Sequence, residues 1–138
     1  MEARVERGRR LSIARNHTAT HLLHKALKEV LGEHVNQAGS LVAPERFRFD
    51  FTHFAPVTSQ QIDEIEQIVN FHIRENLPVE KFVTTLEEAK DSGATALFGE
   101  KYGEKVRVVK IGSYSIELCG GTHLDSTGEI GYFRILNE

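Results

Sequence analysis

The sequence of 138 residues has only one cysteine and no long apolar run. A single cysteine excludes a disulfide within the chain, which suits a reducing compartment. No stretch approaches the roughly 20 apolar residues that a membrane helix needs, and the N-terminus lacks the apolar region of a secretory signal. Internal repeats and linkers rich in Pro, Gly or Ser are also missing. We therefore expect one cytoplasmic domain over residues 1–138, without a membrane partner.

The charge balance is slightly acidic, with a formal net charge of −3. This argues against a protein that coats nucleic acid through charge alone. Five arginines nevertheless crowd the first fifteen residues: Arg4, Arg7, Arg9, Arg10 and Arg15. They predict either a local patch that holds phosphates or a solvated helix end.

Hydrophobic periodicity predicts a helix over 12–31, because its apolar residues fall on one arc and Gly32 can end it. Strict alternation in RFRFDF predicts a half-buried strand over 46–51. The other predicted elements are a strand over 37–42, a helix from Thr58 to about Asn76, a short strand over 81–84, a short helix from Thr85 to Gly93, a hairpin of 106–111 with 114–118, and a last strand over 130–136. Together they predict an α+β fold, a two-layer sandwich of helices packed on a largely antiparallel sheet.

The stretch HTATH places His17 and His21 four residues apart in the first predicted helix. Side chains with this spacing lie one above the other, so the two imidazoles can share one ion. His24 lies close to the same line and can compete as a ligand. A pair of this kind is also common without any ligand.

The stretch ELCGGTH supplies a second pair, Cys119 and His123, after a predicted strand. Alternation gives Cys119 the opposite phase to Leu118, and Gly120 with Gly121 would let the backbone turn sharply so that the pair converges. A lone cysteine is often only a small buried hydrophobe. Three imidazoles and one thiolate together suit one tetrahedral zinc ion, between the helix and the strand end.

The spacing alone does not give the role of the ion. HTATH lacks the glutamate of HExxH, so a protease of that type is not expected. Four protein ligands are typical of a structural site, whereas catalytic zinc keeps an open position. A structural zinc and a zinc hydrolase both remain open at this point.

The chain resembles the editing domain of alanyl-tRNA synthetase and, more distantly, free-standing alanyl-tRNA editing proteins. The motifs that carry the resemblance are NHTATHLLHKAL (16–27), HVNQAGSLV (34–42), RFRFDFTHF (46–54), LFGEKYGEKVRV (97–108), ELCGGTH (117–123) and GEIGYFRI (128–135). The threonyl enzyme's editing domain shares both ligand spacings, but Arg-Gly-Pro is expected there in place of Gly-Gly-Thr.

The resemblance implies a hydrolase that cuts the ester of alanine tRNA mischarged with serine or glycine and spares alanyl-tRNA. It implies zinc held by His17, His21, Cys119 and His123. It also implies that the chain binds alanine tRNA and does not bind DNA. The chain is expected to be excised from a longer synthetase, whose other domains would be further partners, or else to be a natural short editing protein.

Two further positions match the family's editing pocket, Thr20 and Gln37. A Thr20 hydroxyl can bond the hydroxyl of serine, which alanine lacks, although it can equally bond its own helix backbone. Glycine has no hydroxyl, so a small pocket must admit it. Gln37 can orient a water or the substrate, and the Gly120 and Gly121 N–H groups can face an oxyanion.

The single-stranded acceptor end of a tRNA needs phosphate contacts and base stacking. Arg48, Lys101 and Tyr102 are candidates for these contacts, and a solvated strand edge and loop explain them equally well. Three other functions stay open, namely a non-catalytic zinc-stabilised RNA-binding module, a metal-dependent hydrolase of another ester and the related threonyl-type editing activity.

Overall fold

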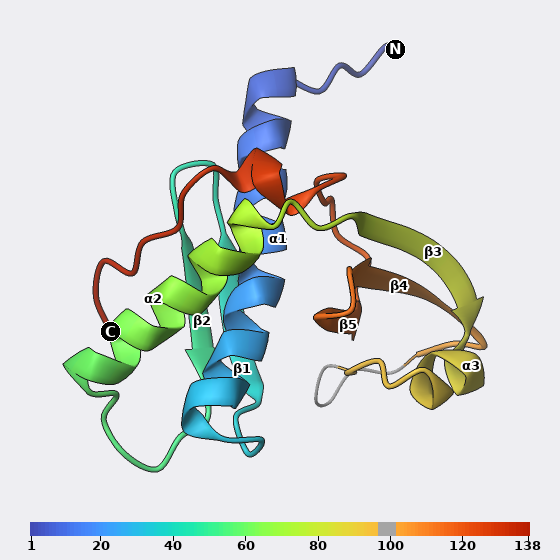
Figure 1. The fold of residues 1–138 in the computed structure, drawn as a ribbon. Helices are drawn as coiled ribbons and strands as arrows, with labels where there is room; N and C mark the ends of the chain where they lie inside the picture. The colour runs from blue at the N-terminus through green and yellow to red at the C-terminus, as the bar shows by residue number, and fades with distance from the viewer. Residues whose placement is uncertain (97–101) are drawn as a thin grey trace.

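The computed structural model describes residues 1–96 and 102–138 (Figure 1). In these ranges the chain forms three α-helices, two antiparallel sheets and one 3-10 helix. Their bounds, in chain order, are α1 Arg7–Leu31, β1 Gln37–Val42, β2 Phe47–Phe51, α2 Ser59–Arg74, β3 Val79–Thr85, α3 Leu86–Asp91, β4 Lys105–Ile111, β5 Ser115–Leu118 and η1 Thr127–Ile130.

The α+β class is confirmed, but the single sheet of the prediction was wrong. The strands form a β1–β2 hairpin and a separate sheet in the order β3-β4-β5, both antiparallel. Helix α1 contacts β1 and β2 of the hairpin and also β5 of the other sheet. Figure 1 shows the reason for the separation, because α1 runs through the middle of the molecule with a sheet on either side.

Helix α1 begins at Arg7, five residues before the predicted start at 12, and ends before Gly32 as expected. Residues 7–10 are exposed, and arginine is a good helix former, so the helix extends without an apolar face there. Gly32 has φ 124°, a backbone conformation that favours glycine. No helix in the described part of the chain is both long and apolar enough to cross a membrane.

The predicted capping of two helices is confirmed. Thr58 Oγ1 accepts the Gln61 backbone N–H at 3.1 Å, and Gln61 Oε1 accepts the Thr58 backbone N–H at 2.9 Å. This reciprocal capping box satisfies backbone donors that would otherwise lack partners at the start of α2. Thr85 likewise accepts the Glu88 N–H at the start of α3.

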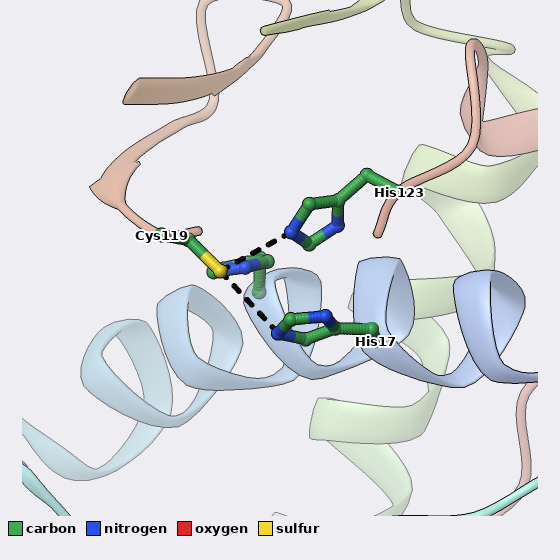
Figure 2. A group of neighbouring side chains, drawn as sticks. His17, Cys119 and His123 are labelled. Atoms are coloured by element: carbon green, nitrogen blue, oxygen red, sulfur yellow. Dashed lines mark hydrogen bonds between the residues drawn. The ribbon is translucent and has the colours of Figure 1, made fainter. Parts of the chain in front are cut away.

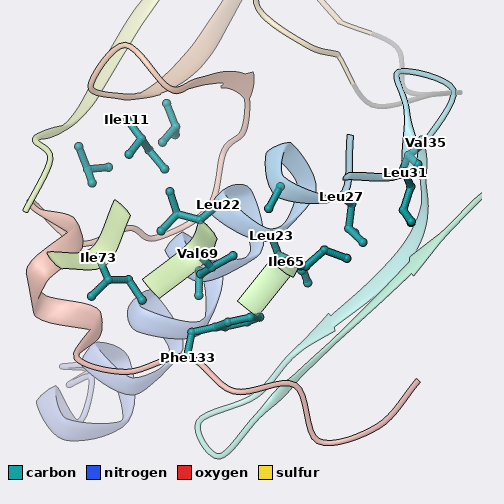
Figure 3. Packing of buried hydrophobic residues seen from close by; sticks show 14 residues of the cluster. Leu22, Leu23, Leu27, Leu31, Val35, Ile65, Val69, Ile73, Ile111 and Phe133 are labelled. Carbon is teal, nitrogen blue, oxygen red and sulfur yellow. The ribbon is translucent and has the colours of Figure 1, made fainter. Parts of the chain in front are cut away.

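The main core lies where α1 and α2 cross (Figure 3). Leu22 and Leu27 of α1 pack there with Ile65 and Val69 of α2, and Phe133 closes one side. A second, smaller core lies between α3 and the three-stranded sheet. It consists of Ala89, Val106, Val108 and Leu118.

The predicted hairpin is confirmed with a longer turn, whereas the predicted last strand was wrong. β4 and β5 pair from Ile111 with Ser115, so three residues rather than two form the loop. Residues 131–138 form no helix or strand. The Phe133 N–H donates to Asn70 Oδ1 at 2.9 Å, and Asn70 Nδ2 donates to the Phe133 carbonyl at 2.8 Å. A side chain of α2 thus takes the place of a neighbouring strand.

Candidate metal centre

Four side chains from two distant segments meet in one group. His17 and His21 come from α1, and Cys119 and His123 come from the segment that follows β5. One ligand atom from each lies within 4.8 Å of the others. Cys119 Sγ lies 3.4 Å from His17 Nε2 and 3.3 Å from His123 Nε2 (Figure 2). The structure therefore brings together all four of the ligands proposed from the sequence, and this group can bind a metal ion.

The helix accounts for the first pair. His17 and His21 are one turn apart, and their ring centroids are 5.4 Å apart. The ring of His123 lies against both, with centroids at 4.2 Å from His17 and 4.7 Å from His21. His24 is not in the group, so its suggested competition for the ion is not supported.

Gly121 is needed because His17 leaves no room beside it. A Cβ atom added at Gly121 would lie 1.8 Å from Cε1 of the His17 ring, far inside contact distance. A Cβ at Gly120 would meet nothing within 4 Å. Cys119 and His123 converge as expected, and neither glycine between them has a positive φ. The close approach of the segment to α1 is what requires Gly121.

Several hydrogen bonds hold the Cys119 segment in place. The Cys119 N–H donates to the Arg107 carbonyl at 3.0 Å, and the Arg107 guanidinium donates to the Gly121 carbonyl. The Gly121 N–H donates to Cys119 Sγ at 3.4 Å. Arg107 of β4 therefore braces the segment from one side.

Thr18 braces the same segment from α1. This fully buried residue accepts the Leu124 N–H on its Oγ1 at 3.1 Å, and the same oxygen lies 3.2 Å from His123 Nδ1. With Nδ1 facing Thr18, His123 has Nε2 free to face Cys119. Such outer contacts set which ring nitrogen can bind an ion.

Glu117 holds His21 in a similar way. This buried carboxylate places Oε2 at 3.2 Å from His21 Nδ1 and Oε1 at 3.3 Å from His24 Nδ1. The Nε2 atoms of His21 and His24 are buried and have no hydrogen-bond partner among the described residues. For His21 that nitrogen lies in the four-residue group, where a cation would satisfy it.

The electrostatics of the group favour a cation. Burial raises the pKa of the Cys119 thiol, but contacts with His123 and His17 outweigh it and lower this pKa to about 3. Burial opposes charge on His21, yet Glu117 raises the pKa of His21 to about 10. The His21 ring thus carries an extra proton between the Cys119 thiolate and the Glu117 carboxylate, and a metal ion can take the place of that proton.

The same surroundings also shift the pKa values of His123 and Glu117. Burial lowers the pKa of His123 to about 4, which keeps this imidazole neutral and able to bind metal. Burial also acts to raise the pKa of Glu117, but the neighbouring His21 outweighs it and lowers this pKa to about 2.

Thr20 and Gln37 make local hydrogen bonds rather than bonds to the ligand group. The buried Thr20 hydroxyl donates to the Asn16 carbonyl at 2.9 Å, which is the backbone contact weighed above. Gln37 begins β1, and its Nε2 donates to Ser40 Oγ at 3.0 Å. Within the described residues the structure records no hydrogen bond between either side chain and the four ligands.

Two of the residues proposed for tRNA contacts, Arg48 and Tyr102, lie in different parts of the structure. Arg48 donates two hydrogen bonds to Asp50, at 2.9 and 3.1 Å. It lines a cavity of about 830 Å³ between α1, β2 and the C-terminal segment, and none of the four ligands lines this cavity. Tyr102 is partly buried against the second core. Lys101 lies outside the described residues.

The sequence reasoning missed Glu117, Thr18 and Arg107. For Glu117 a signal was available, because strand alternation places residues 117 and 119 on the same face. Thr18 and Arg107 act through contacts between distant segments, and nothing local in the sequence marks them.

Comparison with known proteins shows that the chain is similar to one part of synthetase sequences. Residues 106–138 match the family described as the threonyl and alanyl tRNA synthetase second additional domain. The chain is 64% identical over all of its 138 residues to the alanine–tRNA ligase of Desulforamulus reducens and covers 16% of that protein. It is 63% identical over 136 residues, 99% of the chain, to the alanine–tRNA ligase of Pelotomaculum thermopropionicum and again covers 16%.

A third relative agrees with these two. The alanine–tRNA ligase of Carboxydothermus hydrogenoformans is 66% identical over 134 residues, which is 97% of the chain and 15% of that protein. The chain thus spans about one sixth of the length of the relatives it matches. Over its whole length it is related to one region of the alanine–tRNA ligases, the region that includes the second additional domain, and the resemblance found in the motifs is confirmed.

Proposed function

We propose that the chain is an aminoacyl-tRNA editing domain, a deacylase that hydrolyses seryl- and glycyl-esters of alanine tRNA and spares the alanyl-ester. The observation that carries the proposal is the group of His17, His21, Cys119 and His123. HTATH and ELCGGTH, which supply these ligands, belong to the motifs of the resemblance, and the relatives are alanine–tRNA ligases.

The proposed setting follows from the relatives. The chain would be a single editing domain of a longer cytoplasmic ligase, with alanine tRNA and the remaining domains of that ligase as partners. Parts outside the domain would contribute to the choice of tRNA, so we expect the isolated chain to bind tRNA weakly and with little selectivity.

The proposed ion is zinc. Three imidazoles and a thiolate form a donor set that zinc prefers, and the buried Nε2 of His21 has no other partner in the described structure. When bound, zinc would supply positive charge that anchors the substrate or polarises a water. An aminoacyl ester is already activated, so a well-placed water suffices without a strong base.

Thr20 is proposed to recognise serine. Its hydroxyl hydrogen is committed to the Asn16 carbonyl, so its oxygen offers lone pairs and would accept a hydrogen bond from the serine hydroxyl. Alanine lacks that hydroxyl, and a site built on such a bond discriminates strongly. Glycine has no hydroxyl, so this bond does not account for cleavage of the glycyl ester, and a small pocket that admits glycine would have to do so.

Gln37, Gly120 and Gly121 are proposed to act on the reacting ester. Gln37 would orient the water or the substrate. The Gly121 N–H already donates to Cys119 Sγ, which favours the Gly120 N–H as the donor to the developing oxyanion.

The test is a deacylation assay on the purified chain with seryl-, glycyl- and alanyl-forms of alanine tRNA. We expect release of serine and glycine and little release of alanine. A chelator should stop the reaction, and added zinc should restore it. Cys119→Ala should abolish cleavage while circular dichroism stays unchanged, and Thr20→Val should slow cleavage of the seryl ester more than that of the glycyl ester.

A second function has one observation in its favour. Four protein ligands complete a tetrahedral shell, which is typical of a structural zinc. A non-catalytic RNA-binding module would bind the same tRNAs and cleave none of them, so the assay separates the two functions. Cleavage of small esters without cleavage of aminoacyl-tRNA would point instead to a hydrolase of another ester.

A further inference from the structure

Glu117 is a buried carboxylate that lies between two imidazoles. It is 6% exposed, and each of its oxygens faces one ring nitrogen, Oε2 that of His21 and Oε1 that of His24. A buried carboxylate is costly unless hydrogen bonds compensate it. Two N–H donors at 3.2 and 3.3 Å provide that compensation.

This arrangement sets the tautomer of both histidines. When the Nδ1–H of His21 donates to the carboxylate, the lone pair of a neutral ring is on Nε2. That nitrogen belongs to the four-ligand group and has no partner elsewhere in the described structure. In the other tautomer Nε2 would carry the hydrogen and could not bind an ion.

His24 holds the second oxygen of the same carboxylate. It is 3% exposed, it lies one turn along α1 from His21, and its ring centroid is 5.3 Å from that of Phe49. The ring is therefore held by the core rather than by an ion. Its contact with Oε1 keeps the carboxylate from rotating away from His21.

We propose that Glu117 and His24 are a pair of positioning residues for the metal centre, which hold His21 with Nε2 toward the ion. Neither touches the substrate in this scheme. The inference rests on the metal site proposed above and goes beyond it, because it assigns two residues outside the ligand set.

The main test is zinc affinity, measured by competition with a coloured chelator. In Glu117→Gln the side chain has one acceptor oxygen instead of two, so its NH₂ must face one of the two Nδ1–H groups. We expect zinc to bind about 10–100-fold more weakly, as is typical when an outer partner of a ligand is lost. The control is Glu87→Gln, the same change at an exposed position of α3, which should bind zinc like the wild type.

A second pair of variants separates positioning from packing. His24→Ala removes the donor to Oε1, whereas His24→Gln can still donate an amide N–H to it. We expect His24→Ala to weaken zinc binding and His24→Gln to restore part of the loss. Nitrogen NMR of the imidazoles in the zinc-loaded chain should show His21 with its hydrogen on Nδ1 in the wild type and a mixture of the two tautomers in Glu117→Gln.

The possible failures are distinguishable. If Glu117→Gln folds and binds zinc as tightly as Glu87→Gln, the positioning role is wrong and the metal centre stands. If the wild-type chain binds no zinc, both the metal centre and this inference are wrong. Should Glu117→Gln fail to fold, the His24 pair decides, because equal zinc affinity in His24→Ala and wild type overturns the inference.

Discussion

The molecule has a larger region, formed by α1, α2, the β1–β2 hairpin and the C-terminal segment, and a smaller region, formed by β3, β4, β5 and α3. The larger region has the main core (Figure 3). Among the described residues, the smaller region has four buried apolar residues in a core of its own, and two residues of β4, Val109 and Ile111, pack into the main core instead. The smaller region therefore depends on its contacts with the larger one, and the group of His17, His21, Cys119 and His123 is one of these contacts.

Contacts of several kinds join the regions. Val109 and Ile111 supply apolar packing, and the four ligands supply a polar contact, with two residues on α1 and two beyond β5. Tyr114, in the turn between β4 and β5, supplies a further contact. Its hydroxyl donates to Glu29 at 3.2 Å, and its ring stacks on His72 with centroids 3.6 Å apart.

The largest effect should come from the main core. Leu22 is fully buried there, and Leu22→Ala should lower the free energy of unfolding by about 2–5 kcal/mol, from lost burial and the cavity left behind. Urea unfolding measures this. Val108→Ala in the second core removes two carbon atoms. It should lower the free energy of unfolding by about 0.8 kcal/mol, or somewhat more, for each of them.

Hydrogen exchange then tests whether the regions differ as described. We expect Leu22→Ala to speed exchange in both regions, and Val108→Ala to speed it mainly in β4, β5 and α3. If both substitutions speed hydrogen exchange in α2 equally, the chain unfolds as one unit and the two regions do not differ in stability.

The next largest effect concerns the contact between the Cys119 segment and α1. Gly121→Ala would place a methyl group within the His17 ring, so the ring must move away from the ligand group. We expect a cost of about 1–3 kcal/mol, or roughly 5- to 150-fold in zinc affinity. Gly120→Ala, where the added atom meets nothing, is the matched control. Equal affinity of the two variants would contradict the close approach.

The smallest effect is expected at Tyr114. Burial, aided by the Glu29 carboxylate, raises the pKa of this phenol above its ordinary value of 10.0. The folded form therefore keeps the proton while the unfolded form loses it, so the free energy of unfolding should fall as the pH rises above 10. Tyr114→Phe should reduce this dependence, as measured by urea unfolding across the alkaline range. An unchanged slope would show that the phenol ionises freely in the folded chain.

The sequence predicted the features that depend on local spacing. The pair in HTATH follows from helix geometry, and the helix caps at Thr58 and Thr85 follow from side chains that bond the nearby backbone. It did not predict features that depend on distant segments. Residues 130–136 have the apolar pattern of a strand, but the Asn70 side chain on α2 forms hydrogen bonds with the backbone of Phe133. The role of Gly121 likewise depends on the His17 ring, which is remote in the chain.

The separation of Cys119 from His17 by 102 positions has a consequence for biosynthesis. The ribosome releases the two helical histidines early, whereas the sulfur donor emerges only after most of the domain has left the exit tunnel. A nascent chain would thus hold half of its donor set while residues 22–118 are made, and a pair of imidazoles alone retains divalent ions poorly. Tight capture of an ion would therefore mark a chain in which the segment after β5 has already joined α1.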